Sequence, residues 1–185
     1  SDSDPLRIML IDDQMVTEAV LRRQLRDERG MELHYCHQAA DALVMAEHLH
    51  PTVILQDLFM PGIDGLTLLS RFRESPILRE VPVLMLTVQE DSETKARAFA
   101  LGANDYLIKL PDRVEMVARL RYHAGAYRAW RQHRRSEARF RNLFAFSREA
   151  IFIANASTGR IEACNDAAVK LMALPREKIL GLPHI

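Results

Sequence analysis

The stretch Thr52–Gly65, TVILQDLFMPGIDG, consists of an apolar run, one carboxylate and a turn. The run Thr52–Leu55 lies between turn residues, which is typical of a strand buried on both faces of a parallel sheet. Asp57 then falls at the carboxyl end of that strand, where open α/β sheets bind their ligands. Pro61–Gly62 and Asp64–Gly65 predict a turn before the next helix. A single acid at a strand end indicates little, so its meaning depends on the other strands.

Apolar runs and helical patterns alternate on both sides of this stretch. The expected strands are 7–11, 32–36, 52–55, 81–87 and 105–108, and the expected helices are 16–28, 39–49, 66–72, 91–101 and 114 to about 144. Five strands that alternate with five helices predict an α/β fold with a doubly wound parallel sheet of the (βα)5, flavodoxin-like type. Both faces of such a sheet are covered, and its crossovers are right-handed.

The last expected helix is long enough to connect two units. No proline lies between Pro111 and Pro175, and Gly125 is the only glycine in that interval before Gly159. Residues 1–121 carry 20 acidic and 14 basic side chains, residues 122–145 carry 1 and 6, and residues 146–185 carry 4 and 5. We therefore expect an acidic domain at 1–121, a basic linker helix at 122–145 and a second unit at 146–185.

The basic linker leaves its role open. Its apolar spacing holds as far as Tyr127 and then gives way to arginines. A solvated connector and a helix that pairs with a second copy fit this pattern about equally well. Binding of nucleic acid fits less well, because no recognition motif accompanies the arginines. We expect a homodimer through residues 114–145.

From Ala150 the pattern changes to that of a small α+β unit. Residues 150–156 and 161–165 predict a hairpin with Thr158–Gly159 at the bend. A short helix is expected at 166–174, with one further turn at 177–180. Two strands and one helix provide little core, so we expect this to be the beginning of a domain.

Composition narrows the class of protein. No apolar run approaches the ~18–20 residues that a membrane span needs, and the first residues lack the basic and apolar regions of a signal peptide. Cys36 and Cys164 have neither metal-site nor disulfide spacing, so we expect free thiols in a reducing cytosol. These features predict a cytoplasmic protein.

Four further side chains are expected at the same edge of the sheet as Asp57. Asp12 and Asp13 follow the first strand, Thr87 ends the fourth and Lys109 follows the fifth. Each has an ordinary alternative: a helix cap or turn former for the acids, a strand residue for Thr87, a solvated cation for Lys109. Their joint occurrence at the correct strand ends favours one shared site.

The expected chemistry of this site is phosphoryl transfer. Three close carboxylates repel one another unless a cation joins them, and hard oxygen ligands suit Mg²⁺. An ionised Asp57 can then act as a nucleophile on phosphorus. Lys109 offers a positive charge, and Thr87 a hydroxyl donor, to the phosphoryl oxygens.

These residues resemble the receiver domain of two-component response regulators over about residues 5–125. The matching pieces are Asp12–Asp13, Asp57, Met60–Gly62, Asp64–Gly65, Leu86–Thr87 and Tyr106 three residues before Lys109. The resemblance implies that a partner histidine kinase phosphorylates Asp57.

It also implies roles for the neighbouring residues. Asp12, Asp13, Asp57 and the main-chain carbonyl of Phe59 would hold Mg²⁺, and Thr87 and Tyr106 would form a switch pair.

Two positions depart from the family pattern. Leu110 stands where the family usually has proline directly after the lysine, so a cis bond between Lys109 and Leu110 is in doubt. Val88 is bulkier than the small residue that usually follows the switch threonine and could restrict access to Asp57. The phrases ILQDLFMPGIDGLTLL and GANDYLIKLPD are similar in particular to receivers of Wsp-type response regulators, which carry diguanylate cyclase output.

The tail resembles the first part of a PAS domain, of which more than half would be absent. The resemblance rests on 139–144, 150–153, 159–161, Asn165 and Gly181. An unrelated α+β extension is the alternative.

We therefore expect a non-enzymatic response regulator that relays phosphorylation of Asp57 to a PAS region and to an output domain outside this chain, with cyclic-di-GMP synthesis as one candidate. A phosphohydrolase with an aspartate nucleophile is one alternative, but Asp57-Leu58-Phe59 lacks its second acid. A nucleotide or flavin module would need a glycine-rich loop after the first strand, where Ile11–Gln14 stands instead. A phosphorylation-independent interaction module is the remaining alternative.

Overall fold

The computed structural model describes residues 4–88, 91–109 and 111–183. The chain divides between Ala129 and Trp130 into two compact units. Among the described residues, no helix is both long and apolar enough to cross a membrane.

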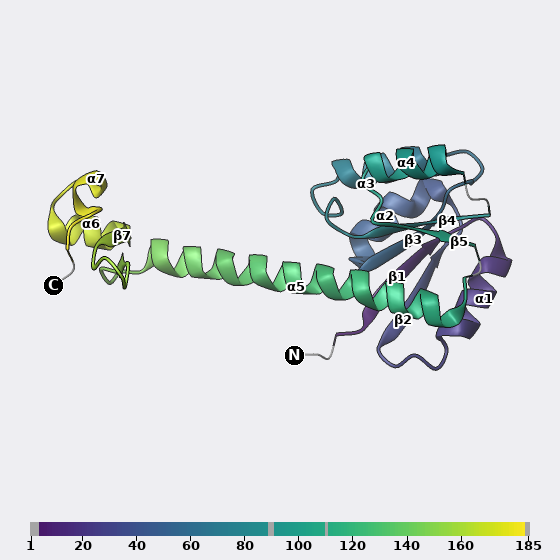
Figure 1. Cartoon of the computed structure of the whole chain (residues 1–185), viewed down its shortest axis with the longest axis horizontal. Helices are drawn as coiled ribbons and strands as arrows, with labels where there is room; N and C mark the ends of the chain where they lie inside the picture. The colour runs from purple at the N-terminus through teal and green to yellow at the C-terminus, as the bar shows by residue number, and fades with distance from the viewer. Residues whose placement is uncertain (1–3, 89–90, 110, 184–185) are drawn as a thin grey trace. The chain divides into compact units, whose positions relative to one another are not determined.

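The first unit is built on a five-stranded parallel sheet (Figure 1). Its strands are β1 (Leu6–Ile11), β2 (Met31–Cys36), β3 (Val53–Asp57), β4 (Val83–Thr87) and β5 (Asp105–Ile108). They lie in the order β2-β1-β3-β4-β5, and every neighbouring pair is parallel. All residues of β3 and β4 are buried, as expected of central strands covered on both faces.

Helices cover both faces of this sheet (Figure 1). They are α1 (Met15–Leu25), η1 (Ala39–Asp41), α2 (Ala42–Leu49), α3 (Gly65–Glu74), α4 (Ser92–Ala100) and α5 (Arg113–Phe146). One core cluster joins the sheet to α2, α3 and α4. The other joins it to α1 and α5. The predicted doubly wound (βα)5 fold is thus confirmed.

Several boundaries differ from the sequence-based expectation. α1 ends at Leu25 rather than at residue 28. β4 begins at Val83, because the amide of Val81 closes a turn on the carbonyl of Leu78. In α5 the residues that face the core are Met116, Leu120 and Ala124, whereas Val114 is 75% exposed.

The second unit contains a small antiparallel sheet. Its elements are β6 (Phe152–Ala154), β7 (Ile161–Cys164), α6 (Asp166–Met172) and α7 (Arg176–Ile179). Asn165 connects them, because its side chain accepts hydrogen bonds from the amides of Ile151 and Ala168 and donates one to the carbonyl of Glu149. The core of this unit is small, and its fully buried side chains include those of Cys164 and Ala168. Cys36 and Cys164 are both buried free thiols.

Candidate functional site

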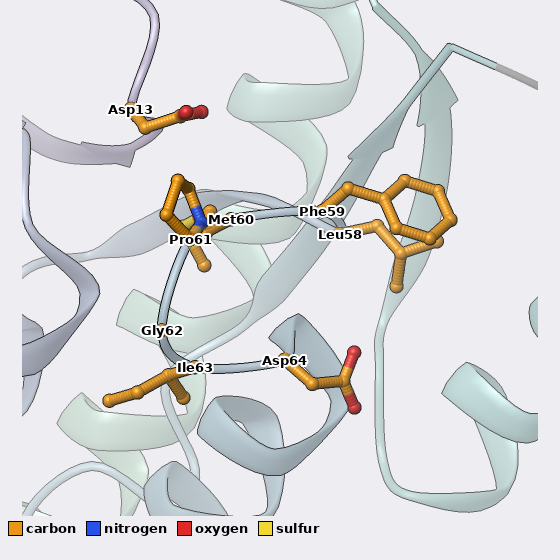
Figure 2. Close-up of a pocket in the computed structure, with 8 residues that line it drawn as sticks. All are labelled: Asp13, Leu58, Phe59, Met60, Pro61, Gly62, Ile63 and Asp64. Carbon is orange, nitrogen blue, oxygen red and sulfur yellow. The ribbon is translucent and has the colours of Figure 1, made fainter.

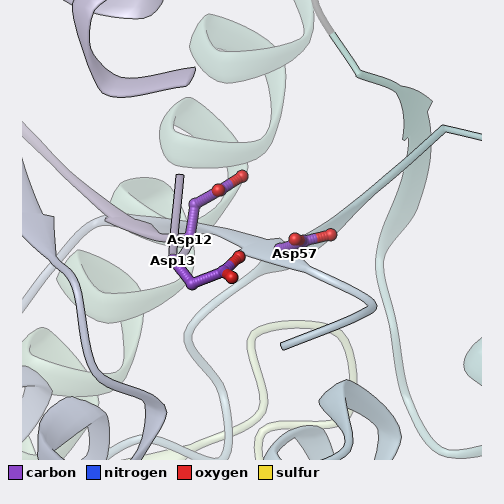
Figure 3. Close-up of side chains that lie close together, drawn as sticks. All are labelled: Asp12, Asp13 and Asp57. Atoms are coloured by element: carbon purple, nitrogen blue, oxygen red, sulfur yellow. The ribbon is translucent and has the colours of Figure 1, made fainter. Parts of the chain in front are cut away.

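Three carboxylates gather at the carboxyl ends of β1 and β3 (Figure 3). Asp12 and Asp13 directly follow β1, and Asp57 is the last residue of β3. Oxygen atoms of the three side chains lie within 4.8 Å of one another. Asp12 and Asp57 are 0% and 1% exposed, so two of these acids are fully removed from water.

Each of the two buried carboxylates is oriented by the loop that follows its strand. Asp12 Oδ1 accepts a hydrogen bond from the amide of Gln14 at 2.8 Å. Asp57 Oδ1 accepts one from the amide of Phe59 at 3.2 Å. In both cases the aspartate side chain accepts a hydrogen bond from the amide two residues further along the chain, which forms the local turn that aspartate favours. The other oxygen of each carboxylate, Oδ2, is left to face the site.

Lys109 supplies the positive charge at these two oxygens. Its Nζ lies 2.7 Å from Asp57 Oδ2 and 3.0 Å from Asp12 Oδ2, and its side chain is 7% exposed. The lysine reaches this point because it follows β5, whose carboxyl end lies at the same end of the parallel sheet as that of β3. Burial alone would lower the pKa of Lys109, but its contacts with Asp57 and Asp12 outweigh burial and raise it. Lys109 therefore stays protonated.

The surroundings of Asp57 disfavour the ionised form of its carboxyl group. Burial raises the pKa of Asp57, and the nearby charge of Asp12 adds to the effect. The hydrogen bonds from Lys109 and from the Phe59 amide act in the opposite direction without cancelling it. A cation beside Asp57 would favour the ionised, nucleophilic form.

The donor set fits a divalent metal ion of the magnesium type. Three carboxylates face one ammonium group, so the site is left with an excess of negative charge. Among the described residues, Asp13 Oδ1 is buried without a hydrogen-bond partner, and Asp12 Oδ2 has an ion pair but no well-directed hydrogen bond. Buried carboxylate oxygens in this condition are the hard ligands that Mg²⁺ takes together with water and phosphate oxygens.

A cleft opens beside the carboxylates between Asp13 and the loop 58–64 (Figure 2). The ring of Phe59 is 60% exposed, while its amide is tied to Asp57. The role predicted for Phe59, as a metal ligand through its main-chain carbonyl, stays a prediction.

Thr87 and Tyr106 lie on the neighbouring strands β4 and β5. Thr87 is 1% exposed, and its carbonyl accepts a hydrogen bond from the amide of Lys109. Tyr106 is 7% exposed, and its hydroxyl group has no hydrogen-bond partner among the described residues. Lys95 of α4 places its Nζ 5.6 Å from the centre of the Tyr106 ring. This cation–π contact could not be predicted from the sequence, because it depends on how α4 packs.

Two further positions are those that depart from the family pattern. Val88 is 63% exposed beyond the end of β4. The sequence leaves in doubt whether the peptide bond between Lys109 and Leu110 is cis, and Leu110 lies outside the described part of the chain.

A family model of the response regulator receiver domain matches residues 8–121. The chain belongs to the response regulator receiver family. A PAS domain model matches residues 138–185. A receiver domain is thus followed by α5 as a linker helix and by a PAS region.

Individual relatives agree with this assignment. The transcriptional regulatory protein TrcR of Mycobacterium tuberculosis is 31% identical over 121 residues, which is 65% of this chain and 46% of TrcR. A candidate response regulator from Chloroflexus aurantiacus has 34% identity and a TM-score of 0.62, and the match covers 66% of this chain and 99% of that one.

The receiver domain of a sensor histidine kinase from Pseudomonas aeruginosa, solved with magnesium in its active-site cleft, has 27% identity and a TM-score of 0.59. That match covers 65% of this chain and 98% of the other. The chain spans about half the length of the curated transcriptional regulators it matches. The closer likeness to Wsp-type receivers stays a prediction.

Proposed function

We propose that this receiver domain accepts a phosphoryl group on Asp57 from a phosphohistidine of a histidine kinase, in a reaction that depends on Mg²⁺. The observation that carries the proposal is the geometry at Asp57. A buried carboxylate lies 2.7 Å from the Lys109 ammonium and within reach of two further acids at a cleft. Such a site can attack phosphorus and hold the product.

In this reaction an oxygen of Asp57 forms a bond to phosphorus while the bond between phosphorus and the histidine nitrogen breaks. The electron pair of that bond returns to the imidazole, which leaves as a neutral ring with a proton from water. Lys109, which is paired with Asp57 before the reaction, then pairs with an oxygen of the new acyl phosphate. Thr87 would donate its hydroxyl to another phosphoryl oxygen.

Asp12, Asp13, Asp57 and the carbonyl of Phe59 would hold the magnesium ion. The unpartnered oxygen of Asp13 and the magnesium found in the P. aeruginosa receiver support this assignment. Bound Mg²⁺ supplies the charge that lets phosphoryl oxygens approach three carboxylates.

The response would pass from the site to the rest of the chain through Thr87 and Tyr106, which form the proposed switch pair. Val88 would modulate access of the phosphodonor. We assign residues 1–121 to the receiver, 122–145 to a linker helix that pairs in a homodimer, and 146–185 to the first part of a PAS domain. The output lies outside this chain, with cyclic-di-GMP synthesis as one candidate.

Acetyl phosphate with Mg²⁺ tests the proposal. We expect intact-mass measurement to find one phosphoryl group per chain, and none with Asp57→Asn or in excess EDTA. Asp27→Asn is the control, since this acid is exposed and lies outside the site, and it should be labelled normally. Labelling that persists in Asp57→Asn would contradict the assignment, and rapid turnover of free phosphoesters would favour a phosphohydrolase.

A further inference from the structure

Gln56 is a buried polar residue next to the phosphoacceptor. It lies in β3 directly before Asp57 and is 0% exposed. Its Nε2 donates a 2.6 Å hydrogen bond to the carbonyl of Gly65, nine residues further along the chain. Its Oε1 is buried without a hydrogen-bond partner among the described residues. A polar side chain that is only half satisfied in the centre of a sheet calls for a reason other than packing.

The hydrogen bond of Gln56 closes the base of the loop between β3 and α3. The amide of Gly65 donates to the carbonyl of Leu58 at 3.1 Å. A Cβ atom on Gly65 would lie 2.6 Å from the Leu58 carbonyl oxygen and 2.7 Å from that of Asp57. The two ends of the loop are therefore in direct contact, and Gln56 fastens this contact from inside the sheet.

The closed loop is the one that forms the cleft of the site. Residues 58–64 line it opposite Asp13 (Figure 2). The loop also fixes Phe59, whose amide donates to Asp57 Oδ1 at 3.2 Å. A shift at its base would move the Phe59 main chain and the Asp57 carboxylate together.

We infer that Gln56 is a positioning residue, which holds this loop so that Asp57 and the Phe59 carbonyl can bind the metal ion. The inference rests on the proposed function. The inference also explains why position 56 holds an amide side chain although its oxygen has no hydrogen-bond partner among the described residues. Stability alone does not require the Gln56 amide. Gly65 is the first residue of α3, so helix geometry directs the main-chain amide of residue 69 to the Gly65 carbonyl even without Gln56. An apolar side chain of similar size would leave no buried polar atom at position 56.

Magnesium titration of Gln56→Met separates a positioning role from a structural one. Methionine keeps the length of the side chain but cannot donate to Gly65. We expect the Kd for Mg²⁺, measured by calorimetry, to rise about tenfold, as for other groups that orient metal ligands. The urea midpoint in EDTA should be no lower than that of the wild type. Ile54→Met is the matched control, because Ile54 is also 0% exposed and lies two residues earlier in β3.

A Kd within about twofold of wild type in Gln56→Met, and in Gln56→Leu if the first variant does not fold, would overturn the inference. An equal loss of affinity in Ile54→Met would also overturn it. If the wild type itself gives no binding heat with Mg²⁺, the proposed metal site fails together with the inference. Normal wild-type binding with unaffected variants removes the inference alone.

Discussion

Asp57 combines two demands that oppose each other in the absence of a ligand. The residue must be buried, so that a phosphoryl group is held among fixed charges, and burial raises the pKa of its carboxyl group. The Lys109 ammonium at 2.7 Å offsets this only in part. The ionised site therefore lowers the stability of the free protein and strengthens its affinity for a cation. Function and folding stability conflict at this residue.

We predict that Asp57→Asn stabilises the protein at pH 7 in EDTA. Because the pKa of Asp57 is higher in the folded than in the unfolded chain, the wild type loses stability as the pH rises through the folded pKa. Asparagine has no such loss. The gain should be about 1 kcal/mol, or about 4–8 °C in Tm for a small domain, and should shrink towards pH 4. Urea denaturation of both proteins at several pH values measures it.

Saturating Mg²⁺ provides the control for this prediction. The wild type gains stability from the bound ion, and the variant has lost one ligand, so the order of the two proteins should reverse. A variant that is less stable than wild type in EDTA at pH 7 would show that the ion pair with Lys109 outweighs burial.

The site residues differ in how far the sequence could reveal them. Asp12, Asp57 and Lys109 could be predicted, because parallel strands bring their carboxyl ends to one edge whatever the details of packing. Gln56 could not, because an amide within a strand acquires its role only when the loop to Gly65 closes. The contact of Lys95 with Tyr106 likewise depends on the orientation of α4, which has a single buried residue, Ala98.

Among the elements, α3 is connected by the side chain of Arg73 to the segments that precede β4 and β5. Arg73 donates hydrogen bonds to the carbonyls of Arg79, Val81 and Gly102 and to the Asn104 side chain, at 2.8–3.0 Å. These acceptors lie in the connections that lead into β4 and β5. Burial lowers the pKa of Arg73. The guanidinium group of Arg73 therefore holds α3 and these two connections together through hydrogen bonds rather than through apolar packing.

Arg73→Met is predicted to destabilise the first unit by about 3 kcal/mol, because three carbonyls, including that of the buried Val81, lose a charged donor at once. Urea denaturation measures the change. Arg71→Met is the control, since Arg71 is exposed on the same helix, and it should change stability by less than about 0.5 kcal/mol. Equal effects of the two substitutions would refute the role of Arg73.

Element boundaries show where sequence patterns stop being informative. The length of α5 could be predicted, because proline and glycine are nearly absent from residues 112–158. The beginning of β4 could not, because Val81 has the apolar character of a strand residue but its amide closes a turn on Leu78. Likewise, Val114 and Met116 are both apolar, and only the position of α5 on the sheet decides that Met116 is buried.

For the whole molecule, the open question is what covers the second half of α5. The last buried residue of this helix is Ala124, and none is buried in 125–146. Trp130, His133, Glu137, Phe140 and Phe144 follow the alternating spacing of three and four residues that is found where two helices pair. Arg128, Arg131, Arg135 and Arg139 lie on the opposite side of the helix. This arrangement favours a second copy of the chain, which would cover the aromatic side and leave these four arginines in water.

We predict a homodimer that depends on Phe140, which is 57% exposed and stacks on Phe144 at a ring distance of 6.0 Å. Phe140→Gln removes an aromatic contact from both copies at once, so the dimer Kd should rise at least about tenfold. Light scattering coupled to size exclusion measures the mass over a range of concentrations. Arg135→Gln, on the opposite side of the helix, should leave the dimer intact. A wild type that stays monomeric at high concentration, with and without beryllofluoride as a phosphoryl mimic, would exclude pairing through this helix, because the aromatic side would then be solvated in both states.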